Sequence, residues 1–100
     1  KDYFLNRKGA KVFFDSSKQP SLRINEGSNI FNVLSVGFTK DRVPTVTICE
    51  GEDCICYKLP NELFEWTMDY VALANMGTNA FPSKVEFTKC NDSFYANLIK

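Results

Sequence analysis

The sequence contains no histidine, and this absence removes several kinds of functional site at once. A Ser-His-Asp triad, a Cys-His dyad and a metal site with imidazole ligands all need a residue that the chain lacks. A cysteine nucleophile would have no imidazole base beside it. We therefore predict that the protein is not an enzyme.

Long apolar runs and glycine-rich loops are missing as well. No run approaches the roughly 20 apolar residues that a membrane-spanning helix needs. The 5 glycines are scattered, which excludes a phosphate-binding loop. No charged-then-apolar signal segment is visible at the start of the given sequence. The sequence leaves the location open, and we favour an intracellular one. We expect no membrane contact and no cofactor.

The composition is that of an ordinary globular domain. Hydrophobic residues make up 44% and charged residues 24% of the 100 positions, which argues against a disordered tail. No internal repeat or linker divides the chain. We expect one domain over residues 1–100.

Alternating apolar and polar residues predict an antiparallel sheet of about five strands packed on one helix, an α+β fold. Short strands are expected at residues 11–15 and 21–25. The nearly continuous apolar run over residues 30–39 predicts a strand in the centre of the sheet.

A hairpin is expected over residues 43–58, with residues 50–53 as a four-residue loop. This register places Cys49 opposite Cys54 and puts the apolar side chains of both strands on one face. That core face comprises Val46, Ile48, Ile55 and Tyr57, and the polar or semi-polar face comprises Thr45, Thr47, Cys49, Cys54, Cys56 and Lys58. A cross-strand disulfide and a pair of free thiols both fit the register. The spacing of these cysteines is not a familiar zinc spacing, so we expect no metal.

Residues 61–76 predict the helix, with Asn61 as N-cap and Gly77 at its end. Its broad apolar face comprises Leu63, Phe64, Thr67, Met68, Val71 and Ala74. The acids Glu62, Glu65 and Asp69 lie opposite, with Trp66 and Leu73 beside them. Either another segment of the chain covers Trp66 and Leu73, or this patch binds a partner.

A C-terminal hairpin is expected over residues 84–99, with residues 91–92 as a two-residue turn. It either extends the sheet or covers the helix, for which the aromatic residues 3–5 are a second candidate. Its predicted apolar face comprises Val85, Phe87, Phe94, Ala96 and Leu98.

The formal net charge of zero conceals two oppositely charged halves. Residues 1–42 carry eight basic and four acidic residues, a net charge of +4, and residues 43–100 carry the reverse, a net charge of −4. Aromatic residues are interleaved with the basic ones in the first part. Single-stranded nucleic acid needs this combination, cations for phosphates and rings for bases.

The strand-to-helix junction Leu59-Pro60-Asn61-Glu62-Leu63-Phe64 resembles that of the transcriptional-coactivator and whirly-type single-stranded DNA-binding families. The resemblance covers roughly residues 43–76 and implies binding of single strands on a curved sheet face, by a dimer. It assigns no individual binding residue. The neutral charge and the hairpin after the helix depart from the family pattern.

Two main hypotheses follow. The first is a non-enzymatic module that binds single-stranded nucleic acid, as a monomer or a homodimer, through the basic residues Arg7, Lys8, Lys11, Arg23, Lys40 and Arg42. The alternative is a small protein-interaction module or inhibitor that uses the helix surface formed by Glu62, Glu65, Trp66, Asp69 and Leu73. A third hypothesis, which ranks lower, is a secreted domain with disulfides.

Overall fold

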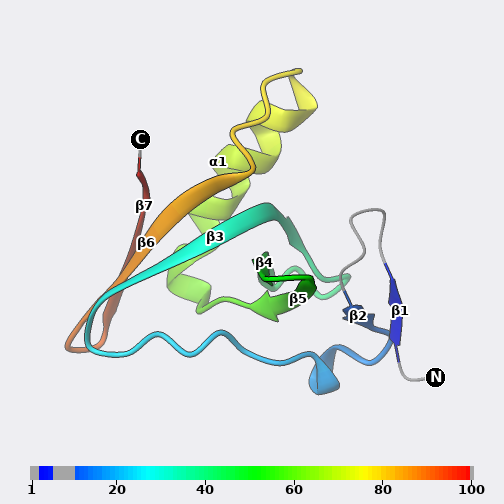
Figure 1. Ribbon diagram of the computed structural model, residues 1–100, viewed down its shortest axis with the longest axis horizontal. Helices are drawn as coiled ribbons and strands as arrows, with labels where there is room; N and C mark the ends of the chain where they lie inside the picture. Colours follow the sequence, from blue (N-terminus) through cyan, green and yellow to red (C-terminus); the bar gives the residue numbers. More distant parts are fainter. Residues whose placement is uncertain (1–2, 6–10, 100) are drawn as a thin grey trace.

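The computed structural model describes residues 3–5 and 11–99, which form one sheet and one helix (Figure 1). The helix α1 spans Phe64–Asn75 and follows the short 3-10 turn η2 at Asn61–Leu63, and a second such turn, η1, spans Ser16–Lys18. The strands are β1 Tyr3–Leu5, β2 Lys11–Phe13, β3 Gly27–Phe38, β4 Pro44–Glu50, β5 Asp53–Lys58, β6 Ser83–Cys90 and β7 Ser93–Ile99. The α+β class is confirmed. No helix in these residues is long and apolar enough to cross a membrane.

The described strands form one seven-stranded mixed sheet in the order β1-β2-β5-β4-β3-β6-β7. The prediction of about five strands, all antiparallel, is wrong in detail, because β2 runs parallel to β5. Strand β3 is an interior strand with a neighbour on each side, as expected for its apolar run. Its first half pairs with β6 and its second half with β4, and the register shifts between Val33 and Ser35.

The first 25 residues depart most from the predicted strands. Residues 21–25 form no strand, and Ser21 makes only an isolated parallel bridge to Lys58. Leu22 and Ile24 still pack into the core, so the alternation marks a buried side of an extended segment. The aromatic residues 3–5 form β1, which pairs with β2 at the edge of the sheet and does not cover the helix.

Both predicted hairpins have the expected register. In β4–β5, Val46 pairs with Tyr57, Ile48 with Ile55, and Cys49 with Cys54, and these two cysteines form a disulfide. The loop is shorter than predicted, because Glu50 also pairs with Asp53. The tight turn needs a positive φ, which Gly51 supplies at 63°.

The β6–β7 hairpin matches the prediction pair by pair, from Cys90 opposite Ser93 to Val85 opposite Leu98. It extends the sheet beyond β3. Val85 and Phe87 are fully buried on the face toward the helix, whereas Tyr95 is exposed on the other face. The hairpin also contacts the helix, as the other expectation had it, because Phe87 of β6 packs against Trp66.

The helix begins differently from the prediction and ends as predicted. Asn61 is the first residue of η2, and the N-cap positions are occupied by Pro60 for η2 and by Leu63 for α1, so the predicted N-cap is wrong. At the other end Gly77 has a φ of 91°. The Gly77 N–H donates to the carbonyl of Ala74 and the Thr78 N–H donates to that of Leu73, the two hydrogen bonds of a Schellman motif.

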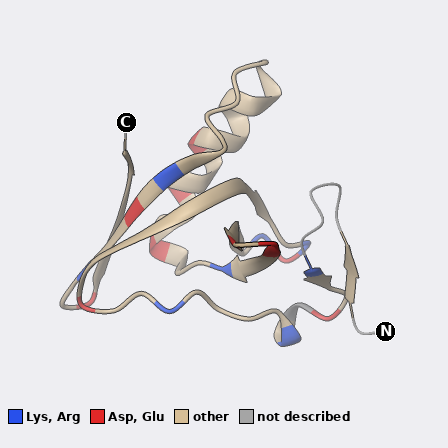
Figure 2. Ribbon diagram, in the orientation of Figure 1, with Lys and Arg blue, Asp and Glu red and all other residues tan. Residues whose placement is uncertain are grey.

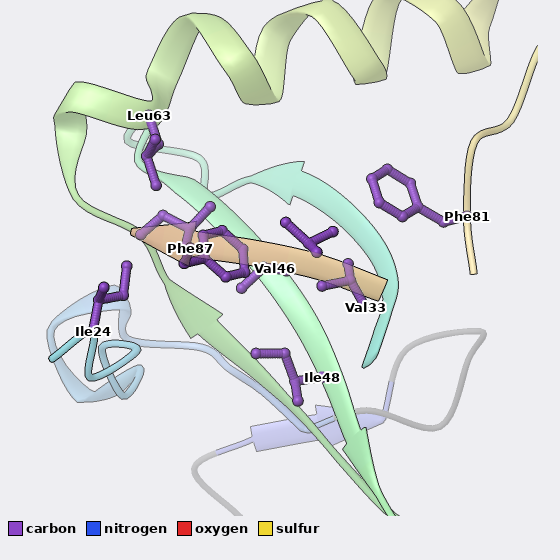
Figure 3. Packing of buried hydrophobic residues seen from close by; sticks show 9 residues of the cluster. Ile24, Val33, Val46, Ile48, Leu63, Phe81 and Phe87 are labelled. Carbon is purple, nitrogen blue, oxygen red and sulfur yellow. The ribbon is translucent and has the colours of Figure 1, made fainter. Parts of the chain in front are cut away.

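The hydrophobic core lies between one face of the sheet and the start of the helix (Figure 3). Val33, Val46 and Phe87 are almost fully buried there, beneath Leu63. Thr67 is also buried, and its hydroxyl donates to the carbonyl oxygen of Leu63 at 3.0 Å. This buried hydroxyl therefore has its hydrogen-bond partner in η2, immediately before the helix.

The other face of the β4–β5 hairpin is buried too, which the prediction of a polar or semi-polar face did not anticipate. Thr45, Thr47 and Cys56 are all less than a tenth exposed. Val12 of β2 lines the same cavity as these three side chains. Because β1 and β2 continue the sheet at this end, the hairpin is an interior part of the sheet.

Candidate nucleic-acid interface

A groove with a volume of about 330 Å³ lies between β2 and the end of β3. Its walls come from the β1–β2 pair, the residues just after β2, and the turn that follows β3. The lining is mainly aromatic with one cation, and includes Phe4, Phe13, Phe14, Phe38, Gln19 and Lys40.

Phe4 and Phe14 form the exposed aromatic part of this groove. Phe4 is 44% exposed and Phe14 is 59% exposed. Their ring centroids are 5.2 Å apart and the ring planes are inclined by 39°. This separation is typical of a pair of rings in contact, so the two side chains form one continuous aromatic surface.

Gln19 holds the β2 side of the groove against β5. Its side chain is buried; Oε1 accepts a hydrogen bond from the Phe13 N–H at 2.7 Å, and Nε2 donates to the carbonyl oxygen of Cys56. Backbone pairing between β2 and β5 comprises Lys11 with Ile55. The glutamine side chain therefore supplies hydrogen bonds that a longer ladder would otherwise make.

The turn after β3 is held by its own backbone and by a threonine hydroxyl. The Thr39 N–H donates to the carbonyl of Val43 at 2.9 Å, and Thr39 Oγ1 accepts from the N–H of Asp41 and of Val43. These bonds fix the backbone that carries Lys40 and Arg42. Lys40 is thereby presented at the rim of the groove.

Asp15 lies close to the cations beside the groove. Hydrogen bonds from the Ser17 hydroxyl and N–H lower the pKa of Asp15 below 3.8, and the ammonium groups of Lys18 and Lys40 lower it further. The carboxylate is fully solvated and ionised at neutral pH. It therefore offsets part of the positive charge near Phe14, so the groove is not a purely basic surface.

The four predicted basic residues that the structure describes do not gather on one face. Arg7 and Lys8 lie outside the described residues. Lys11 lies on the face of β2 opposite to Phe4, with its Nζ 5.1 Å from the centre of the Tyr3 ring. Arg23 is exposed on the long segment before β3, and Figure 2 shows basic positions spread over several elements. Among the six, Lys40 lines the groove and Arg42 lies two residues beyond it.

Of the predicted binding residues, the groove thus contains Lys40, together with aromatic side chains that the charge pattern alone did not bring together. Sequence reasoning noticed that phenylalanines and cations alternate, which is the signal that found Phe4, Phe14 and Lys40. It could not pair Phe4 with Phe14, because their contact depends on the pairing of β1 with β2. It also missed Gln19, whose polar side chain gives no sign of being buried.

The surface of the alternative hypothesis is divided by the fold. Trp66 packs inward, 5.1 Å from the Tyr70 ring and 5.8 Å from the Phe87 ring, and Phe81 also lies against it. Other segments of the chain therefore cover much of Trp66 but leave Leu73 exposed, so the expectation that both are covered holds for Trp66 alone. The remaining members are exposed, namely Glu62, Glu65, Asp69 and Leu73.

Within residues 3–5 and 11–99, no three acidic or cysteine side chains lie together as a candidate metal site.

Comparison of the chain with family models, curated proteins and solved structures finds no match.

Proposed function

We propose that the protein is a non-enzymatic module that binds single-stranded nucleic acid in the groove between β2 and the end of β3. The observation that carries this proposal is the pair of exposed rings, Phe4 and Phe14, beside the ammonium group of Lys40. Bases stack on Phe4 and Phe14, and Lys40 contacts a neighbouring phosphate. Unpaired bases are required, because a duplex hides the faces of its bases.

The physical chemistry of this arrangement sets its expected strength. Stacking of a base on an aromatic side chain contributes about 1–3 kcal/mol and tolerates any base sequence. Each phosphate contact with a lysine adds a salt-dependent term, because counterions are released from the strand. With one lysine at the rim and Asp15 nearby, we expect modest affinity, weak sequence preference and a shallow salt dependence.

The test is fluorescence anisotropy with a labelled single-stranded oligonucleotide, titrated at several salt concentrations. Phe14→Ala should weaken binding about 5–150-fold, the factor that corresponds to one lost stacking contact. Lys40→Ala should reduce the slope of affinity against salt by roughly 0.7, the value for one phosphate contact on a single strand. The matched duplex should bind much more weakly than the single strand.

Leu5→Ala is the matched control. Leu5 is 62% exposed on β1, next to Phe4 in sequence, but its side chain lies on the opposite face of the strand. Its removal should leave affinity unchanged. The proposal fails if the wild-type protein does not bind at low salt, or if Leu5→Ala and Phe14→Ala weaken binding equally.

A further inference from the structure

Strand β7 forms one edge of the sheet and is unusually open. It is last in the strand order, and Figure 1 shows no other drawn element beyond it. Its seven residues, Ser93–Ile99, contain neither a charged residue nor a proline. Edge strands of proteins that stay monomeric usually carry such residues, or bulges, that prevent pairing with another chain. The β7 pairing with β6 is regular throughout, without a bulge.

The register with β6 shows which backbone groups of β7 point outward. A two-residue turn closes on a hydrogen-bonded pair, here Cys90 with Ser93. Alternation along the strand then directs the N–H and C=O groups of Phe94, Ala96 and Leu98 away from β6. Within the described part of the chain, no strand pairs with this side of β7.

The side chains of β7 have a pattern that is complementary to itself. When two copies of the strand run antiparallel about Ala96, Phe94 of each lies opposite Leu98 of the other, on the core side. Both side chains are half-buried in the single chain, so this pairing would cover apolar surface that the chain alone leaves open. On the outer face, Tyr95 lies opposite Asn97 of the other copy.

We propose that two copies of this chain associate through antiparallel pairing of β7 with β7, on a two-fold axis at Ala96. This register uses the whole strand, satisfies the outward backbone groups of Phe94, Ala96 and Leu98, and brings no like charges together. A two-fold axis closes the assembly at two chains, because the same edge is used on both sides. The sheets of the two chains join into one, and the helices do not take part.

Sedimentation velocity over a wide range of protein concentration tests the proposal with a pair of charge variants. Tyr95→Lys with Asn97→Lys places like charges directly opposite each other across the axis, which is destabilising. This double variant should sediment as a monomer at concentrations where the wild type is a dimer. Both positions are exposed, so circular dichroism should show an unchanged fold.

Tyr95→Lys with Asn97→Glu is the matched variant. It changes the same two positions but places opposite charges across the axis, so the dimer should return. Met76→Lys adds a charge on the exposed end of the helix, and should leave dimerisation unchanged. The proposal is overturned if the wild type is monomeric throughout, if the two-lysine variant still dimerises, or if the lysine–glutamate variant does not.

Discussion

The two free cysteines, Cys56 and Cys90, have opposite environments, although both lie on strands of the same sheet. Cys90 is exposed at the end of β6, whereas Cys56 is buried on β5. Burial raises the pKa of the Cys56 thiol above 9.0, because a thiolate loses its hydration there, and hydrogen bonds with Thr45 and Thr47 offset only part of this. Since the thiolate is the reacting form of cysteine, burial protects Cys56 twice, by excluding reagents and by suppressing ionisation.

We predict one fast and one slow thiol in the folded protein. Iodoacetamide should label Cys90 at the rate of an exposed thiol and Cys56 only after unfolding. Peptide mass spectrometry after timed quenching measures both rates in one sample, and Cys49 and Cys54 should stay unlabelled until the disulfide is reduced. Equal labelling rates of Cys56 and Cys90 in the native protein would contradict this.

The pH dependence follows from the direction of the same pKa shift. The folded-state pKa of Cys56 is raised, so its contribution to stability is fully present below the unfolded value of 9.0. The contribution is lost as the pH rises through the higher folded-state pKa. Cys56→Ser, which does not ionise in this range, should therefore show a smaller loss of stability in alkaline solution than the wild type.

At the scale of elements, the end of the helix offers the cleanest test of a local backbone requirement. Gly77 has a φ of 91°, and a Cβ added there would meet no atom within 4 Å. Any cost of Gly77→Ala is therefore conformational, and the left-handed region costs an ordinary residue about 1 kcal/mol or somewhat more. For a domain of this size, the melting temperature should fall by roughly 4–8 °C.

Thermal unfolding followed by circular dichroism measures this loss. Thr78→Ala is the control, because it keeps the backbone N–H that bonds to Leu73 and removes only an exposed side chain. If Gly77→Ala and Thr78→Ala have equal melting temperatures, the positive φ at position 77 does not require glycine.

The elements that sequence predicted well are those whose geometry is set locally. Both hairpins have short turns, and one register alone puts their apolar residues on one face, so Val46 with Tyr57 and Phe87 with Ala96 could be paired in advance. Residues 21–25 show the same alternation but form no strand, because a strand also needs a neighbour along its length. The β1–β2 pair and the parallel contact of β2 with β5 are non-local, and nothing in residues 3–13 specifies them.

The candidate site was predictable to the same limited extent. Interleaved aromatics and cations indicated the part of the chain that supplies the groove, but the groove combines residues that only tertiary structure brings together. Charge alone predicts Lys11 as a binding residue, because it does not show that Lys11 lies on the face of β2 opposite to Phe4. Trp66 looked exposed on a helical projection, but it turns toward Phe81 and Phe87, which lie after the helix in sequence.

At the scale of the whole molecule, the sheet is held unevenly. β3, β4 and β6 surround the core and pair over long ladders. Among the described residues, β1 pairs with β2, and β2 joins β5 through Lys11 opposite Ile55 and through the side chain of Gln19. Segments with few such contacts open without unfolding the rest. We therefore expect amides of β1 and β2 to exchange with solvent much faster than those of β3 and β6.

Gln19→Ala should widen this difference. The substitution removes the partners of the half-buried Phe13 N–H and of the buried Cys56 carbonyl, which costs about 1–3 kcal/mol and accelerates exchange by about 5–150-fold. Because the loss falls on the attachment of β2, the acceleration should appear in β1 and β2, while β6 amides keep their rates. Hydrogen exchange with mass spectrometry resolves these segments, and Arg23→Ala, an exposed change in the next segment, is the control.

The same variant connects the architecture to the proposed groove. The β1–β2 pair positions Phe4 and Phe14. Gln19→Ala lowers the free energy needed to open this pair, so it should weaken oligonucleotide binding although both rings are still present. The loss of affinity in Gln19→Ala should be no larger than the fraction of molecules with an open β1–β2 pair, which hydrogen exchange measures. If amide exchange in β6 accelerates as much as in β1, then β1 and β2 open only when the whole domain unfolds, and they are not a separately opening unit.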